Sequence, residues 1–146
     1  MPDMAINYDY TLEIDTAPAA AQPAWAPVCA GFSNLAPALN EVLFQTTWLC
    51  SKGWGSTEVT GGQYIVTLTG QRVFGDAAQD FIFSKEVMYA FGKARKTRFR
   101  ITSPEGDKIL WSITLANITE GHGDANQPNA ITVAIHGNGA PTFENA

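Results

Sequence analysis

The 146-residue sequence has few charged residues, two cysteines, two histidines and no long apolar segment. Charged residues make up 16% of the chain, below the roughly 25% of typical soluble domains, which suits a surface that packs against copies of itself. No apolar run approaches the ~18 residues of a membrane-spanning helix. The net charge is −5 and no stretch is a basic patch, which argues against binding nucleic acid by phosphate neutralisation. The first residues lack the basic and apolar regions of a signal peptide, so a cytosolic origin is expected.

The scarcity of cysteine and histidine limits the chemistry that the chain can support. Cys29 and Cys50 have no Cys-x-x-Cys spacing, and we expect buried thiols rather than a disulfide or a metal pair. His122, Asp124 and His136 are the one plausible metal set, but no further ligand has a recognisable spacing, so a structural or surface role is expected. No Gly-x-Ser-x-Gly nucleophile turn is present. The sequence therefore predicts no catalytic residue, no metal and no cofactor.

Alternation of apolar and polar residues predicts a mainly β chain. Strands are expected over residues 6–15, 25–35, 63–74, 97–102, 108–118 and 130–136, with a tight turn at 103–107. Strands do not alternate with helices, so the expected architecture is an antiparallel β-sandwich or half-open barrel. We expect residues 1–146 to form one such domain, with a short C-terminal tail at 137–146.

A helix is expected around residues 76–91, beside the sheet. Asp76 suits the N-cap position, and Gln79 is spaced to return a hydrogen bond to the Asp76 N–H in a capping box. Gly92 then supplies a stop signal. The sequence therefore predicts both ends of this helix from local residues.

The apolar residues of this helix spread almost all round its axis, which is typical of a helix buried on more than one side. Either its first part is not helical or a neighbour covers a second face. We expect Phe81 and Met88 to pack on the chain's own sheet. Phe83, Val87 and Phe91 are then expected to be covered by another subunit or by the segment described next.

Residues 36–62 contain no regular pattern, yet they are too apolar for a solvated disordered loop. We expect an extended hairpin arm that docks on a partner. Its expected contact residues are Leu43, Phe44, Trp48 and Trp54.

Two further residue sets offer alternative readings. Asp9, Glu13 and Asp15 form an acidic face on the first strand, which is more typical of a solvated surface than of a calcium site or an acid–base pair. Trp25 with the two arm tryptophans raises the hypothesis of a carbohydrate-binding module, because exposed rings stack on sugars. Trp111 alternates with isoleucines and is expected in the core.

Several short motifs occur in an order that resembles the tail tube (major tail) proteins of long-tailed bacteriophages. They are Gly-Gly-Gln at 61–63, Gly-Asp-Ala-Ala-Gln-Asp at 75–80, Lys-Thr-Arg-Phe at 96–99, Ser-Pro-Glu-Gly-Asp at 103–107, Gly-His-Gly-Asp-Ala-Asn at 121–126 and the segment 137–143. The resemblance covers residues 60–143 well and the first 60 loosely. The sequence departs from the family pattern at His122 and Ala140.

The resemblance implies a structural virion protein that self-assembles, without catalysis, into hexameric rings. The rings stack into a tube through which DNA passes without specific binding. The implied partners are other copies of the chain and the tape measure, tail-tip or baseplate, and terminator proteins. The implied location is the host cytoplasm during assembly and then the virion tail. Under this reading, Asp9, Glu13 and Asp15 are candidates for the lumen face.

Three alternatives stay open at this point. The first is a tail-terminator or secretion-system tube relative of the same fold. The second is the carbohydrate-binding module, and the third is a metal-dependent enzyme around His122 and His136.

Overall fold

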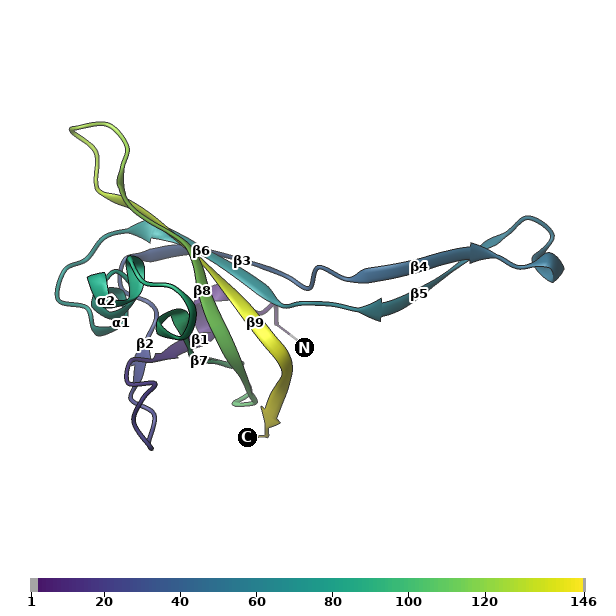
Figure 1. The fold of residues 1–146 in the computed structure, drawn as a ribbon, viewed down its shortest axis with the longest axis horizontal. Coiled ribbons are helices and arrows are strands. Elements are labelled where there is room, and N and C mark those ends of the chain that lie inside the picture. The colour runs from purple at the N-terminus through teal and green to yellow at the C-terminus, as the bar shows by residue number, and fades with distance from the viewer. Residues whose placement is uncertain (1–2, 146) are drawn as a thin grey trace.

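The computed structural model describes residues 3–145 as a curled antiparallel sheet with a helical segment beside it and a long projecting hairpin (Figure 1). Residues 1, 2 and 146, at the ends of the expected domain and tail, lie outside the described residues. None of the helices between residues 3 and 145 is long and apolar enough to span a bilayer.

The main sheet of residues 3–145 contains seven strands in the order β2-β1-β7-β8-β9-β6-β3. Each pair of neighbours is antiparallel. The strands are β1 Thr11–Asp15, β2 Trp25–Pro27, β3 Phe32–Ala38, β6 Ile65–Gln71, β7 Lys96–Thr102, β8 Lys108–His122 and β9 Ala130–Glu144. The predicted mainly antiparallel, half-open barrel is therefore confirmed. Its two edge strands, β2 and β3, leave a seam.

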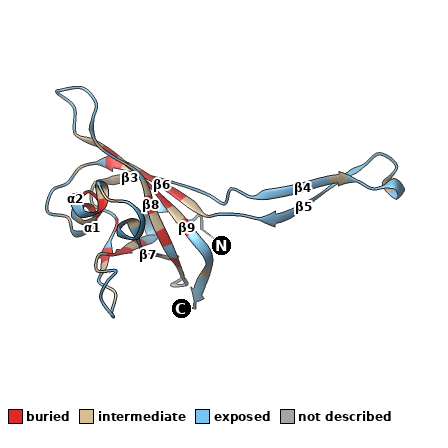
Figure 2. Cartoon of the chain, in the orientation of Figure 1, coloured by how far each residue is buried: buried red, intermediate tan, exposed pale blue. Residues whose placement is uncertain are grey.

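The core forms on the inner side of this curled sheet, because alternate residues of the long strands point the same way. Buried side chains from β7, β8 and β9 include Phe99, Ile113, Val133 and Ile135. The helical segment adds Ile82 to the same cluster. Figure 2 shows the buried residues gathered in the body, whereas the projecting hairpin is exposed.

Several strand boundaries differ from the prediction. The first strand begins at Thr11, because residues Asn7–Asp9 form a 3₁₀ turn, η1. The expected strand at 25–35 is two strands, separated by a bend that contains Gly31 in a left-handed conformation (φ 80°).

The expected C-terminal tail was wrong for residues 137–144. Strand β9 continues to Glu144, which pairs with Lys108 at the start of β8. Strand β8 likewise extends into the predicted polar loop as far as His122. The two strands remain paired because bulges absorb their register shifts.

The helix expected at 76–91 is instead two short helices, α1 Ala77–Ile82 and α2 Lys85–Met88, followed by the 3₁₀ helix η3 Gly92–Arg95. Ser84 adopts an extended conformation (ψ 150°) that ends one helix and starts the next. Because of this break, the side chains of Phe83 and Val87 point into the chain's own core, where they are 7% and 5% exposed. The expectation that a neighbour or the hairpin covers these two residues was therefore wrong. Phe91 is 92% exposed.

The predicted capping box forms only in part. The Asp76 carboxylate accepts a hydrogen bond from the Gln79 N–H (3.1 Å), so Asp76 is the N-cap as predicted. The Gln79 side chain does not return a bond to Asp76. It is fully buried and donates to the carbonyl oxygens of Ala30 (2.8 Å) and Gln71 (3.0 Å), and it accepts from the Val73 N–H (2.8 Å).

This buried amide ties α1 to both the end of β6 and the bend before β3. A Cβ atom at Gly31 would overlap the Gln79 Nε2 atom, so the bend needs glycine both for space and for its positive φ. Gln79 is therefore a tertiary contact residue rather than a helix-capping residue.

Candidate assembly surfaces

The segment that the sequence marked as an arm is an extended hairpin. Strands β4 Val42–Thr47 and β5 Gly55–Gly61 pair antiparallel, and a 3₁₀ turn, η2 Leu49–Ser51, forms the tip between them. Figure 1 shows this hairpin projecting away from the body of the molecule. The prediction of a hairpin arm over residues 36–62 is confirmed, although residues 36–38 belong to β3.

None of the arm residues 39–61 is buried. Leu43, Phe44 and Trp48 are about half exposed, Trp54 is 80% exposed and Leu49 is completely exposed. A two-stranded hairpin alone has marginal stability in water, and large apolar side chains exposed on it are candidates for contact with another surface. The body of the chain does not cover these arm residues, and their expected role as contact residues stays a prediction.

Hydrogen bonds hold the root of the arm to the body. The Asn40 side chain donates to the Gln63 carbonyl (3.2 Å), and the Gln63 N–H donates to the Leu39 carbonyl (2.7 Å). The Gln63 side chain in turn donates to the Gly137 carbonyl on β9 (3.3 Å). These bonds set the direction in which the arm leaves the sheet.

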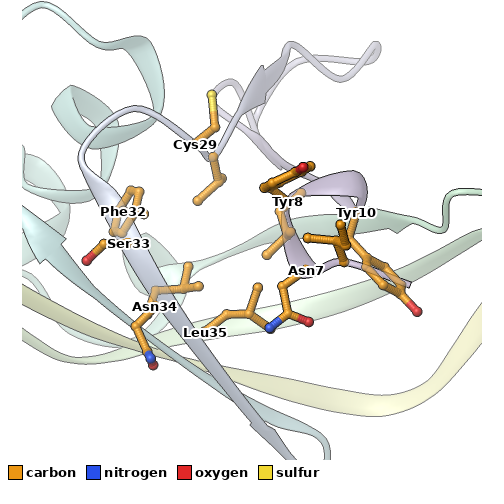
Figure 3. Close-up of a pocket in the computed structure, with 12 residues that line it drawn as sticks. Asn7, Tyr8, Tyr10, Cys29, Phe32, Ser33, Asn34 and Leu35 are labelled. Atoms are coloured by element: carbon orange, nitrogen blue, oxygen red, sulfur yellow. The ribbon is translucent and has the colours of Figure 1, made fainter. Parts of the chain in front are cut away.

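A groove of about 470 Å³ lies at the seam of the half-barrel. Its walls come from the N-terminal segment around η1 on one side and from β3 on the other, with labelled residues on both in Figure 3. Its apolar lining includes Tyr8, Tyr10, Val28, Phe32, Leu35 and Leu68, and no charged residue lines it. Sequence reasoning missed this groove because it treated residues 6–15 as one regular strand.

Both cysteines are free and exposed, so the expectation of buried thiols was wrong. Cys29 lies in the bend between β2 and β3 and contributes to the groove lining. Cys50 lies in η2 at the tip of the arm. Each cysteine lies in a turn outside the core. The prediction was wrong because it rested only on the small, apolar side chain of cysteine.

The expected acidic face is largely neutralised by arginines from β7. Glu13 forms a two-pronged ion pair with Arg100 (2.7 and 3.1 Å), whose guanidinium also lies over the Trp25 ring at 4.4 Å. Asp9 is exposed in η1. The description of Glu13 and Asp15 as an open solvent face was therefore wrong, since β1 pairs directly with the arginine-bearing strand β7.

Asp15 is completely buried. Its carboxylate accepts hydrogen bonds from the N–H groups of Ala17 (2.9 Å) and Ala24 (3.0 Å), and it pairs with Arg98 (2.7 Å). Burial alone would raise the pKa of this carboxyl, but the two N–H bonds and Arg98 outweigh it and lower the pKa below its ordinary value. Asp15 thus closes the 16–24 loop onto the sheet instead of facing a lumen.

The tryptophans do not form a common platform. Trp111 is in the core as predicted and stacks on Tyr64, with the ring centroids 4.3 Å apart. Trp25 lies on the edge strand β2, whereas Trp48 and Trp54 lie at the end of the arm on either side of η2. The structure therefore does not bring the three sugar-binding candidates together.

The structure separates the histidine set. His122 and Asp124 are exposed at the β8–β9 turn, whereas His136 is half-buried within β9, opposite Thr114 of β8. In the part of the chain from residue 3 to 145, no group of three or more His, Cys, Asp or Glu residues is arranged to hold a metal ion.

Two arginines stabilise the helical segment. Arg72 pairs with Glu120 (2.6 Å) and Asp80 (3.2 Å). Arg95 donates to the carbonyl oxygens of Met88 (2.7 Å) and Leu115 (3.0 Å), and so ties the end of α2 to β8. The position of Arg95 after the helix is a local signal for a positive charge near the helix C-terminus, whereas no local motif marks its contact with Leu115 or the ion pairs of Arg72.

Comparison with known proteins places this fold among tail proteins. No protein-family model and no curated protein match the sequence. The tail of an empty gene transfer agent (GTA) particle, refined with C6 symmetry, is similar over 97% of this chain and 99% of its own, with a TM-score of 0.70 and 18% identity. The SPP1 tail tube is similar over 98% of this chain and 80% of its own, with a TM-score of 0.70 and 11% identity.

A third similar structure is the tube-terminating cap of the anti-feeding prophage. It matches 99% of this chain and 97% of its own, with a TM-score of 0.59 and 14% identity. The chain therefore has the fold of tail tube proteins, and the resemblance noted from its motifs is confirmed for the fold.

Proposed function

We propose that this protein is the repeating subunit of a tail tube and that its mechanism is polymerisation rather than catalysis. The observation that carries the proposal is the arm: an apolar hairpin without buried residues on a body that has the tail tube fold. Copies associate head-to-tail into rings, and the rings stack. The C6 symmetry of the similar GTA tail supports six subunits per ring.

The proposed contact residues are those of the arm together with Phe91. Leu43, Phe44, Trp48 and Trp54 are exposed along the hairpin, and Phe91 is exposed beside η3. In a ring built from heterologous contacts, each subunit uses two different surfaces. Such contacts bury apolar area and also cover sheet edges that would otherwise invite aggregation.

The negative charge of the chain suits a conduit for DNA. Six copies of a chain with net charge −5 carry about −30 per ring, a field that repels a polyanion from the enclosing wall. DNA then passes without adhering. Tubes that bind DNA at physiological salt would contradict this part of the proposal.

In the particle, the proposed partners are a tape measure protein inside the tube and tail-tip or baseplate and terminator proteins at its ends. The subunit assembles in the host cytoplasm and resides in the virion tail. These assignments rest on the shared fold and on the proposed tube role.

Negative-stain microscopy of the concentrated protein tests the proposal. Stacked rings or tubes are expected for the wild-type chain. Trp54→Ala is expected to leave the monomer folded and to reduce the tube yield strongly. Tyr89→Ala, which removes an equally exposed aromatic side chain outside the arm, is the matched control. A permanent monomer, or one that binds glycans, would overturn the proposal.

A tube terminator is the second candidate, favoured by the similarity to the tube-terminating cap. A terminator closes a tube instead of extending it. Single rings that do not stack at any concentration would support the terminator and exclude the repeating subunit.

A further inference from the structure

The tip of the arm and the seam groove have complementary chemistry. We define the tip as residues 48–54, which carry Trp48, Leu49 and Trp54 in exposed positions. The groove offers an uncharged wall of aromatic and aliphatic side chains, including Tyr8, Phe32 and Leu35, in a volume of about 470 Å³. Burying large aromatic rings in such a pocket removes apolar surface from water on both partners.

The same chain cannot satisfy this complementarity. The arm leaves the body after β3 and projects away from it (Figure 1), and none of the residues that line the groove belongs to the arm. The groove can therefore be filled by an arm tip only if that tip belongs to another molecule. Since tip and groove are different surfaces, a tip-to-groove contact is heterologous and leaves a free tip and a free groove at each end.

Charge agrees with a second copy as the occupant. The tip carries one cation, Lys52, in an exposed left-handed turn position (φ 57°). Asp9 is exposed in η1, between the groove-lining residues Tyr8 and Tyr10. An apolar tip with one positive charge thus matches an apolar groove with one negative charge at its border.

We propose that the arm tip of one subunit inserts into the seam groove of a neighbouring copy, with Trp48 and Trp54 against the groove wall and Lys52 facing Asp9. This inference rests on the proposed tail tube function and assigns the contact that would link its subunits. It also completes the half-barrel, because the inserted tip covers the apolar wall between the two sheet edges.

The two native cysteines provide a direct test. Cys50 lies on the tip and Cys29 lines the groove, and both are exposed. Treatment of assembled protein with a short bismaleimide cross-linker is expected to produce a ladder of covalent multimers. The ladder is expected to disappear in Cys29→Ser and also in Cys50→Ser, and to be absent from a dilute monomeric sample.

The controls separate failure of this inference from failure of the proposed function. Each sample is examined by microscopy before cross-linking. Rings or tubes without a ladder, or a ladder that persists in Cys29→Ser, would overturn the tip-to-groove contact while leaving the tube intact. A protein that never assembles would overturn both.

A charge exchange tests the orientation of the tip. Asp9→Lys and Lys52→Asp each place like charges together and are expected to lower the cross-linked yield about two- to fivefold, in line with an exposed ion pair. The double variant is expected to recover most of the yield, since it restores opposite charges. Circular dichroism verifies the fold of each variant. Loss without recovery in the double variant would overturn the facing of Lys52 and Asp9.

Discussion

The body and the arm use apolar residues for opposite purposes. In the body, side chains such as Phe99 and Ile135 are at most 1% exposed and form one continuous cluster. In the arm, Phe44 and Trp54 keep half or more of their surface in water. Hydrophobic burial stabilises the body, whereas the arm contributes little burial to the isolated chain. Apolar content alone therefore does not distinguish a segment of the core from an exposed segment.

The largest expected loss of stability is in the body. Phe99→Ala removes a completely buried ring and leaves a cavity, so we expect the free energy of unfolding to fall by roughly 3–5 kcal/mol. Urea denaturation of the monomer measures it. A loss below about 1 kcal/mol would contradict the description of Phe99 as a core residue.

Gln79→Ala tests the buried amide that joins α1 to β6. The substitution leaves the Val73 N–H and the Ala30 carbonyl without their partner, so we expect a loss of roughly 2–3 kcal/mol. Gln45→Ala on the exposed arm strand β4 is the matched control, with an expected change within about 0.5 kcal/mol. Equal losses of unfolding free energy for Gln79→Ala and Gln45→Ala would show that the buried glutamine of the body contributes no more to stability than the exposed glutamine of the arm.

Asp15→Asn tests the buried carboxylate and its pH dependence. Because the pKa of Asp15 is lowered in the folded chain, its ionised form stabilises the protein above the unfolded pKa of about 3.9. This stabilisation is lost as the pH falls through the folded pKa. We expect Asp15→Asn to cost roughly 1.5–3 kcal/mol at pH 7 and to lose less stability than the wild type between pH 4 and pH 2.

Urea unfolding of the monomer at several pH values measures both effects of Asp15→Asn. Asp124→Asn, in the exposed β8–β9 turn, is the control. An acid-induced loss that is the same with and without Asp15 would show that this carboxylate does not contribute to it.

The smallest expected change in stability is in the arm. Phe44→Ala is expected to alter the free energy of unfolding of the monomer by less than about 0.5 kcal/mol, because the side chain is already exposed. Its tube yield is nevertheless expected to fall well below that of the wild type. Sedimentation of assembled material measures this yield. A large loss of monomer stability would show that the arm packs on its own body in solution.

Local signals predicted the parts of the fold that neighbouring residues encode. Two-residue alternation placed Trp111 in the core, and the Asp76 cap marked the start of α1. The arm followed from an apolar segment without helical or strand period. The seam groove was not predicted, because residues 6–15 were treated as one regular strand and its two walls meet only when the sheet curls.

Two of the wrong predictions share a cause. The continuous helix failed at Ser84, where packing of Phe83 and Val87 into the core favoured a break over continued helical hydrogen bonds. The prediction of an exposed acidic face was wrong because Asp15 pairs with Arg98, which is 83 residues away in the sequence. Each outcome depends on a partner that the local pattern does not contain.

The sequence by itself determined the antiparallel β class, the site of the helical segment and the existence of an apolar arm. These features follow from backbone periodicity and turn chemistry among adjacent residues. Only the tertiary structure decided that Val87 is buried while Phe91 is exposed to solvent. It also decided that Gln79 joins α1 to β6 and to the bend before β3, and that a groove opens beside β3. The physical reason is that burial depends on which distant strands return to cover a residue, and this is settled when the sheet closes on its core.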